Sequence, residues 1–203
     1  VALRGSFTVS VAAAARIGDA ELAAHEIATQ LFFLIALALD AVAIAGQALM
    51  GRFLGADDPD GARRVGRRMI QWGLATGLAA CGIVLILRPW LPQVFSDDPE
   101  VIELTSMVLV QLALLAPLAG IVFTLDGILI GAGDMRFLAW AMTGAAALFI
   151  PLVLAVPALE LGLGWLWACY WVLMLARAIP LWVRFVHEKW LVTGATVAPA
   201  ELD

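Results

Sequence analysis

Two carboxylates lie inside long apolar stretches of this sequence and are the first candidates for chemistry. Asp40 falls near the middle of stretch 27–50, and Asp126 falls near the end of stretch 104–130. A charged Asp at the centre of a membrane helix costs about 3 kcal/mol, so such a residue usually faces a cavity or a partner. Each acid could bind a cation or exchange a proton. The alternatives are a packing hydrogen bond for Asp40 and an inner headgroup position for Asp126.

Helical spacing places Asp40 on one face with other polar and small side chains. That face comprises Thr29, Phe33, Ala36, Asp40, Ala43 and Gln47. Bulky leucines lie off this face, and a helix that borders a wet interior needs such a separation. Thr29 and Gln47 are therefore candidate cavity-lining residues.

Two arginines also fall within predicted apolar helices, away from the predicted helix ends. Arg4 and Arg177 could each form an ion pair with Asp40 or Asp126, or extend to the membrane interface. The sequence does not say which acid pairs with which base. Both arginines are candidate cavity-lining residues.

The segment "AAHEIAT", residues 23–29, is similar to a zinc-protease helix but lacks its second histidine, because position 29 is Thr. We expect no metal site there, and we interpret His25 and Glu26 as markers of the outer end of a helix. An enzyme would need a nucleophile and a base, or several metal ligands, at membrane depth. No His falls inside a predicted span, so we expect no enzymatic activity.

The composition indicates an integral membrane protein. The chain has 203 residues, of which 63% are hydrophobic and 14% charged, with a mean hydropathy of +0.96. Soluble domains have roughly 45–50% apolar and about 25% charged residues. The expected partner is therefore the lipid bilayer. A net charge of -5 argues against nucleic-acid binding, which requires a basic surface.

The apolar residues form six blocks, each compatible with the roughly 20 residues that cross a bilayer as a helix. We place them near 1–15, 27–50, 69–87, 104–130, 137–159 and 164–186. Because a lone span must satisfy its own backbone hydrogen bonds, the predicted fold class is all-α, a polytopic membrane helix bundle. Residues 1–190 form the predicted six-helix membrane lobe, and residues 191–203 form a polar cytoplasmic tail.

Basic residues gather in alternate connections between these blocks. They are Arg52, Arg63, Arg64, Arg67, Arg68, Arg136, Arg184 and Lys189, whereas the other connections contain only Arg16 and Arg88 among several acids. The excess of basic residues in cytoplasmic loops predicts that the first set, and the C-terminus, lie in the cytoplasm.

Glycine pairs and prolines inside the blocks predict how the helices pack. Gly51 with Gly55, Gly73 with Gly77, and Gly127 with Gly131 would allow close helix approach. Prolines at 117, 151 and 180 are expected to kink the fourth, fifth and sixth helices.

Three motifs together resemble the multidrug and toxic compound extrusion (MATE) family, in particular its bacterial DinF-like branch. They are "GDAELAAHEI" at the start of the second helix, "AVAIAGQALMGRFLGA" at its end, and "DGILIGAGD" at the end of the fourth. The resemblance implies one lobe of a twelve-helix, two-lobe transporter. Six helices with the first running outward correspond to helices seven to twelve, so we expect a fragment whose partner is a missing N-terminal six-helix lobe.

The resemblance further implies secondary active antiport by alternating access. Drugs or metabolites, especially organic cations, would be exported in exchange for H⁺ or Na⁺, with no cofactor, across a bacterial inner membrane. It also implies a coupling or cation-binding role for Asp126. Some members carry a Glu on the first helix of this lobe, where this chain has Arg4 and no acid. That difference disfavours sodium binding here.

Two alternatives to antiport remain open from the sequence. A lipid-linked saccharide flippase of related fold would need a more basic cavity, and the candidate acids and bases here are balanced. A non-transporting structural membrane subunit would have no need of Asp40 and Asp126 inside its helices.

Overall fold

The computed structural model describes the backbone of residues 2–193 and the side chains of residues 5–193. The regular elements in this part of the chain are all helices, and it contains no strands. The helices are α1 (Ala2–Ile17), α2 (Asp19–Gly55), α3 (Pro59–Leu87), α4 (Leu91–Phe95), α5 (Pro99–Gly131), α6 (Met135–Ala158) and α7 (Leu163–Val186). The six long helices match the six predicted blocks. The short helix α4 was not predicted, because five residues are too few to give a hydropathy signal.

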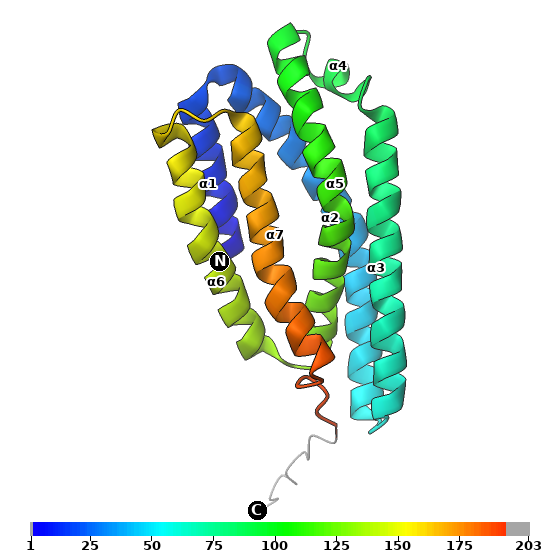
Figure 1. Cartoon of the computed structure of the whole chain (residues 1–203). Coiled ribbons are helices and arrows are strands. Elements are labelled where there is room, and N and C mark those ends of the chain that lie inside the picture. The colour runs from blue at the N-terminus through cyan, green and yellow to red at the C-terminus, as the bar shows by residue number, and fades with distance from the viewer. Residues whose placement is uncertain (1, 194–203) are drawn as a thin grey trace, which may run out of the picture.

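The helices form two packed groups, joined through α5 and α7 (Figure 1). One group comprises α2, α3 and α5, and the other comprises α1, α6 and α7. Helix α5 lies between them and has the largest share of buried residues among the long helices. Residues carried by α2, α5 and α7 can therefore meet in the interior.

The connection between α2 and α3 is much shorter than the sequence predicted. The polar segment 51–68 was interpreted as a loop, but α2 continues to Gly55 and α3 begins at Pro59. Asp58 caps α3 by accepting a hydrogen bond from the backbone N–H of Gly61 at 2.7 Å, and Pro59 suits the first helical turn. The hydropathy pattern marks the membrane boundary, whereas the helices extend beyond it.

The predicted glycine contacts occur at two of the three pairs. A Cβ atom built on Gly77 would lie 2.5 Å from the carbonyl oxygen of Ala116, and one on Gly131 would lie 2.5 Å from that of Gln47. At these points, only glycine allows α3 and α2 to approach α5 so closely. Gly55 has no such neighbour within 4 Å, so its predicted packing role is wrong. The three prolines that are expected to kink helices lie inside α5, α6 and α7.

The outer surface is that of a membrane protein. Helices α2, α3, α5, α6 and α7 are long and apolar enough to span a bilayer, and the described part of α1 has 16 residues. Large apolar side chains are more than half exposed on several helices, including Leu34, Leu37, Ile86, Trp140 and Ile179. The α2–α3 and α5–α6 connections and the segment after α7 share one end, as the charge pattern predicted (Figure 1).

Two ion-pair clusters join segments at this basic end. Arg63 on α3 donates to both carboxylate oxygens of Glu188 at 2.9 Å and to Asp60 at 2.8 Å. Hydrogen bonding from Arg63 holds the pKa of Glu188 below its ordinary value. Arg184 donates from Nε to Asp134 at 2.6 Å. The segment after α7 is thereby attached to α3, and α7 to the α5–α6 turn.

Candidate functional site

A cavity of about 660 Å³ lies between α1, α2, α5, α6 and α7. Its walls are mainly apolar, and the bulky side chains among them are Phe7, Phe32, Phe33, Phe123, Met135, Met142 and Met174. The polar lining consists of Asp40, Gln47, Asp126 and Arg177. An apolar pocket with a few convergent polar groups is the usual form of a small-molecule site.

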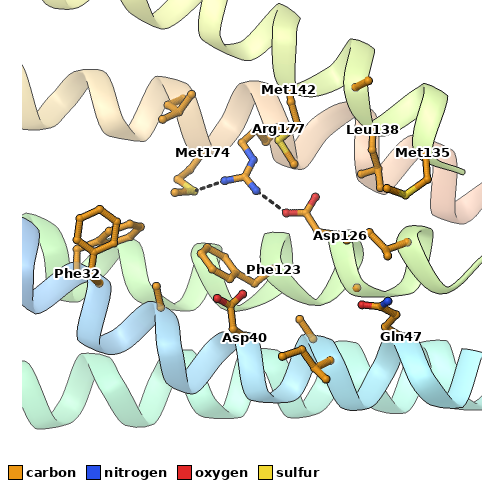
Figure 2. A pocket seen from close by; sticks show the side chains of 18 of the residues that line it. Phe32, Asp40, Gln47, Phe123, Asp126, Met135, Leu138, Met142, Met174 and Arg177 are labelled. Carbon is orange, nitrogen blue, oxygen red and sulfur yellow. Dashed lines mark hydrogen bonds and ion pairs between the residues drawn. The ribbon is translucent and has the colours of Figure 1, made fainter. Parts of the chain in front are cut away.

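Asp126 and Arg177 form an ion pair inside this cavity (Figure 2). Asp126 projects from α5 and Arg177 from α7, and their side chains are 14% and 5% exposed, respectively. The pair shows which of the two arginines is the partner of Asp126. Asp126 lies in the cavity, and its basic partner is Arg177.

The ion pair does not use the full hydrogen-bonding capacity of either group. Oδ1 of Asp126 and Nε of Arg177 are buried without a hydrogen-bond partner among the described residues. Nη1 of Arg177 contacts only the sulfur of Met174, at 3.9 Å, and its guanidinium carbon lies 5.8 Å from the ring centre of Phe123. The pair therefore keeps one unused hydrogen-bond acceptor and one unused donor.

Asp40 and Gln47 point from α2 toward the same cavity (Figure 2). Both side chains are exposed, and the described part of the chain provides no ion-pair partner for Asp40. The predicted polar face of α2 borders the cavity through Phe33, Ala36, Asp40, Ala43 and Gln47. The 3.6-residue period of the helix was therefore sufficient to predict that these residues share one face.

Two of the predicted lining residues are not placed in the cavity. Thr29 is buried, and its hydroxyl has no hydrogen-bond partner among the described residues, but it is not part of the cavity wall. It lies nearer the start of α2, closer to the other end of the bundle. Arg4 belongs to α1, and its side chain lies outside the described residues.

A buried polar cluster near the start of α2 was missed by the sequence interpretation. His25 is fully buried, and its Nε2 lies 3.3 Å from the hydroxyl of Ser10, which lies 2.7 Å from that of Tyr170. His25 was interpreted as a marker of the helix end. That interpretation is wrong because α2 begins at Asp19, which places His25 well inside the helix.

Both the sequence and the fold of this chain are similar to those of known membrane proteins. A sequence profile of the family described as MatE matches residues 2–155, which is most of the chain. The chain belongs to the MatE family. This confirms the resemblance of the sequence motifs, while the DinF-like branch stays a prediction.

Curated relatives of this chain include proteins from Arabidopsis thaliana. Protein DETOXIFICATION 43 is 32% identical over 85% of this chain and 32% of its own length. Protein DETOXIFICATION 44, chloroplastic, is 29% identical over 88% of this chain and 34% of its own length. The chain thus spans about a third of the length of these curated relatives.

Two solved transporters have the same fold as this MatE chain. One is described as the outward-facing conformation of a multidrug resistance MATE family transporter; it is 20% identical, with a TM-score of 0.78 over 96% of this chain and 44% of its own. The other, a MOP superfamily transporter from Pyrococcus furiosus, is 22% identical, with a TM-score of 0.76 over 94% and 41%. The all-α bundle is therefore the fold of one part of a larger transporter.

Proposed function

We propose that this chain forms the C-terminal six-helix lobe of a secondary active antiporter, with a missing N-terminal six-helix lobe as its partner. The whole transporter would export small organic molecules, chiefly cations, in exchange for H⁺ or Na⁺. The observation that carries the proposal is the Asp126–Arg177 pair inside a largely apolar cavity. Ionisable groups at this depth are costly and usually serve transport.

In this proposal, Asp126 is the group for which ligands compete. While it is paired with Arg177, its Oδ1 remains without a partner. A cationic substrate would bind to the carboxylate in place of, or beside, the guanidinium. Proton or sodium binding to Asp126 would remove the attraction and release the substrate. Directed transport requires that each ligand bind the two conformations differently, and the ion gradient supplies that bias.

Asp40 is proposed to provide the second negative charge of the site. It faces the same cavity from α2 and has no ion-pair partner among the described residues. Once Arg177 neutralises Asp126, the described part of the cavity keeps one net negative charge. This balance favours a cation over the phosphate of a lipid-linked saccharide, which would need excess positive charge.

The location proposed for the lobe is a bacterial inner membrane, with the C-terminus in the cytoplasm. The end of the bundle where α2 ends and α3 begins has arginines on both helices, and the segment after α7 lies at the same end. Cytoplasmic loops are enriched in Lys and Arg. A reporter enzyme that is active only outside the cytoplasm, fused to the C-terminus, should be inactive. An active fusion would refute this orientation.

The experiment that tests the proposed function is export of a cationic dye by the protein in its full natural length. In membrane vesicles with an imposed proton gradient, Asp126→Asn should abolish gradient-driven transport. Asp97→Asn makes the same charge change at an exposed site outside the cavity and should transport normally. A sodium gradient in place of the proton gradient separates the two coupling ions. If Asp126→Asn keeps full gradient-driven transport, Asp126 does not couple; if the unchanged protein transports no substrate, the subunit alternative is favoured.

A further inference from the structure

A second pocket lies at the basic end of the bundle, outside the cavity described above. It has a volume of about 240 Å³ and is lined by Phe137, Pro180, Val183, Arg184, His187 and Lys189. The first three side chains are apolar and come from α6 and α7. The other three carry nitrogen and gather where α7 ends. The proposed function uses none of these residues.

The pocket opens beside a surface that faces lipid. Trp140 on α6 is 70% exposed, and Ile179 and Val186 on α7 are 62% and 56% exposed. Large apolar side chains exposed at this level on membrane-spanning helices contact acyl chains. The apolar walls of the pocket therefore continue into the lipid-facing surface, while its basic residues lie at the level where phospholipid headgroups reside.

Arg184 forms a fixed wall of the pocket. Its Nε donates to Asp134 at 2.6 Å, and its guanidinium lies 4.9 Å from the ring centre of Phe137. Asp134 balances the charge of Arg184. The net positive charge of the pocket therefore comes from Lys189, and also from His187 when its ring carries both protons.

Lys189 and His187 have no carboxylate partner among the described residues. The neighbouring acid, Glu188, is occupied by Arg63 on α3. Nδ1 of His187 lies 2.8 Å from the carbonyl oxygen of Val183, which can only accept a hydrogen bond, so this nitrogen carries a proton. The ammonium of Lys189 is then available to donate to an anionic ligand, and Nε2 of His187 donates to it when the ring carries its second proton.

From these observations, we infer that the pocket binds the headgroup of an anionic phospholipid of the adjacent membrane leaflet. The phosphodiester meets Lys189 and His187, and an acyl chain lies along Phe137, Pro180 and Val183. Basic pockets between membrane helices at the cytoplasmic side commonly bind such headgroups, because a fixed cation and a bilayer-facing groove match both parts of the lipid. The bound lipid would hold α6 against α7, which both border the central cavity.

Lipid binding can be measured on the full-length protein, purified in detergent, by native mass spectrometry. The probes are phosphatidylglycerol, which is anionic, phosphatidylcholine, which has no net charge, and soluble glycerol phosphate. We expect one phosphatidylglycerol to bind more tightly than phosphatidylcholine. Lys189→Gln should weaken phosphatidylglycerol binding about fivefold, since a basic residue contributes about 1 kcal/mol near an anionic lipid. It should leave phosphatidylcholine binding unchanged.

The matched control is Arg67→Gln, which removes one exposed positive charge from α3 at the same end of the bundle. It should leave the tightly bound phosphatidylglycerol in place, which separates a built pocket from general attraction to a basic surface. His187→Gln should weaken the binding as Lys189→Gln does. Equal affinity for the two lipids, equal losses from Arg67→Gln and Lys189→Gln, or equally tight binding of glycerol phosphate would each overturn the inference.

Discussion

Removing the charge of Asp126 or of Arg177 should show how much the stability of the bundle depends on their ion pair. The two side chains are only 14% and 5% exposed, so water screens the pair little. Breaking a buried pair by removing one partner costs roughly 3–5 kcal/mol, because the other charge stays buried. Asp126→Asn should reach this range, since a guanidinium cannot lose its proton to escape the penalty.

Removing the other partner should cost less. In Arg177→Met, the Asp126 carboxyl can take a proton from water in the cavity, which leaves an unpaired but neutral group at a cost of about 1–3 kcal/mol. The double variant contains no buried charge at this position. Its loss of stability should therefore be smaller than the sum of the two single losses, by roughly 2–3 kcal/mol.

The assay is reversible unfolding of the full-length protein in mixed detergent micelles, followed by tryptophan fluorescence. Four proteins complete the cycle: the unchanged protein, the two single variants and the double variant. Losses that add to within about 0.5 kcal/mol would refute the account, because they would mean that the two charges do not interact.

Two further predictions concern the rest of the bundle. Gly77→Val should destabilise the protein by roughly 1–3 kcal/mol through crowding against Ala116, whereas Gly82→Val, with open space around its Cβ, should have little effect in the same unfolding assay. The ion pair between Arg63 and Glu188 should keep the segment after α7 in place at pH values above the ordinary pKa of Glu188. It should be lost as the pH falls through the lowered pKa that Glu188 has in the folded protein. The protection of that segment against amide hydrogen exchange, taken relative to the intrinsic rate at each pH, should therefore fall at acid pH. Glu188→Gln should give fast exchange at neutral pH already, and a segment equally protected in both proteins would contradict the role of this link.

Hydropathy was enough to predict the long helices, but not where each of them ends. The segment 51–68 is polar, so it was interpreted as a loop, yet most of it is helical. Polar residues end the membrane span and do not end a helix; the cap at Asp58 and the proline after it mark the actual boundary. The same effect moved the start of α5 from the predicted 104 to Pro99.

The site was predictable where polarity varies along a helix. On α2, the contrast between Asp40, Gln47 and the surrounding leucines gave the face that borders the cavity. On α5 and α7, nearly every residue is apolar, so the pattern could not show which side faces inward. The pairing of Asp126 with Arg177 depends on tertiary packing across two helices and could not be derived from one sequence.

The aromatic walls and the His25 cluster were missed for the same reason. Phe32 and Phe123 look like ordinary apolar positions until the helices are placed around the cavity. His25 could have been recognised as buried, because alanines precede it and no loop residue follows it, but only the structure shows that Ser10 and Tyr170 complete the cluster.

The central claim is that Asp126 binds the cationic substrate and the coupling ion in turn. The most direct test is the affinity of the full-length protein for a cationic dye, measured by fluorescence anisotropy across a pH series. The account predicts that the unchanged protein loses affinity as the pH is lowered, because protonation removes the charge of Asp126, and that Asp126→Asn binds weakly with no such pH dependence. An Asp126→Asn protein whose affinity matches that of the unchanged protein at every pH would contradict the claim.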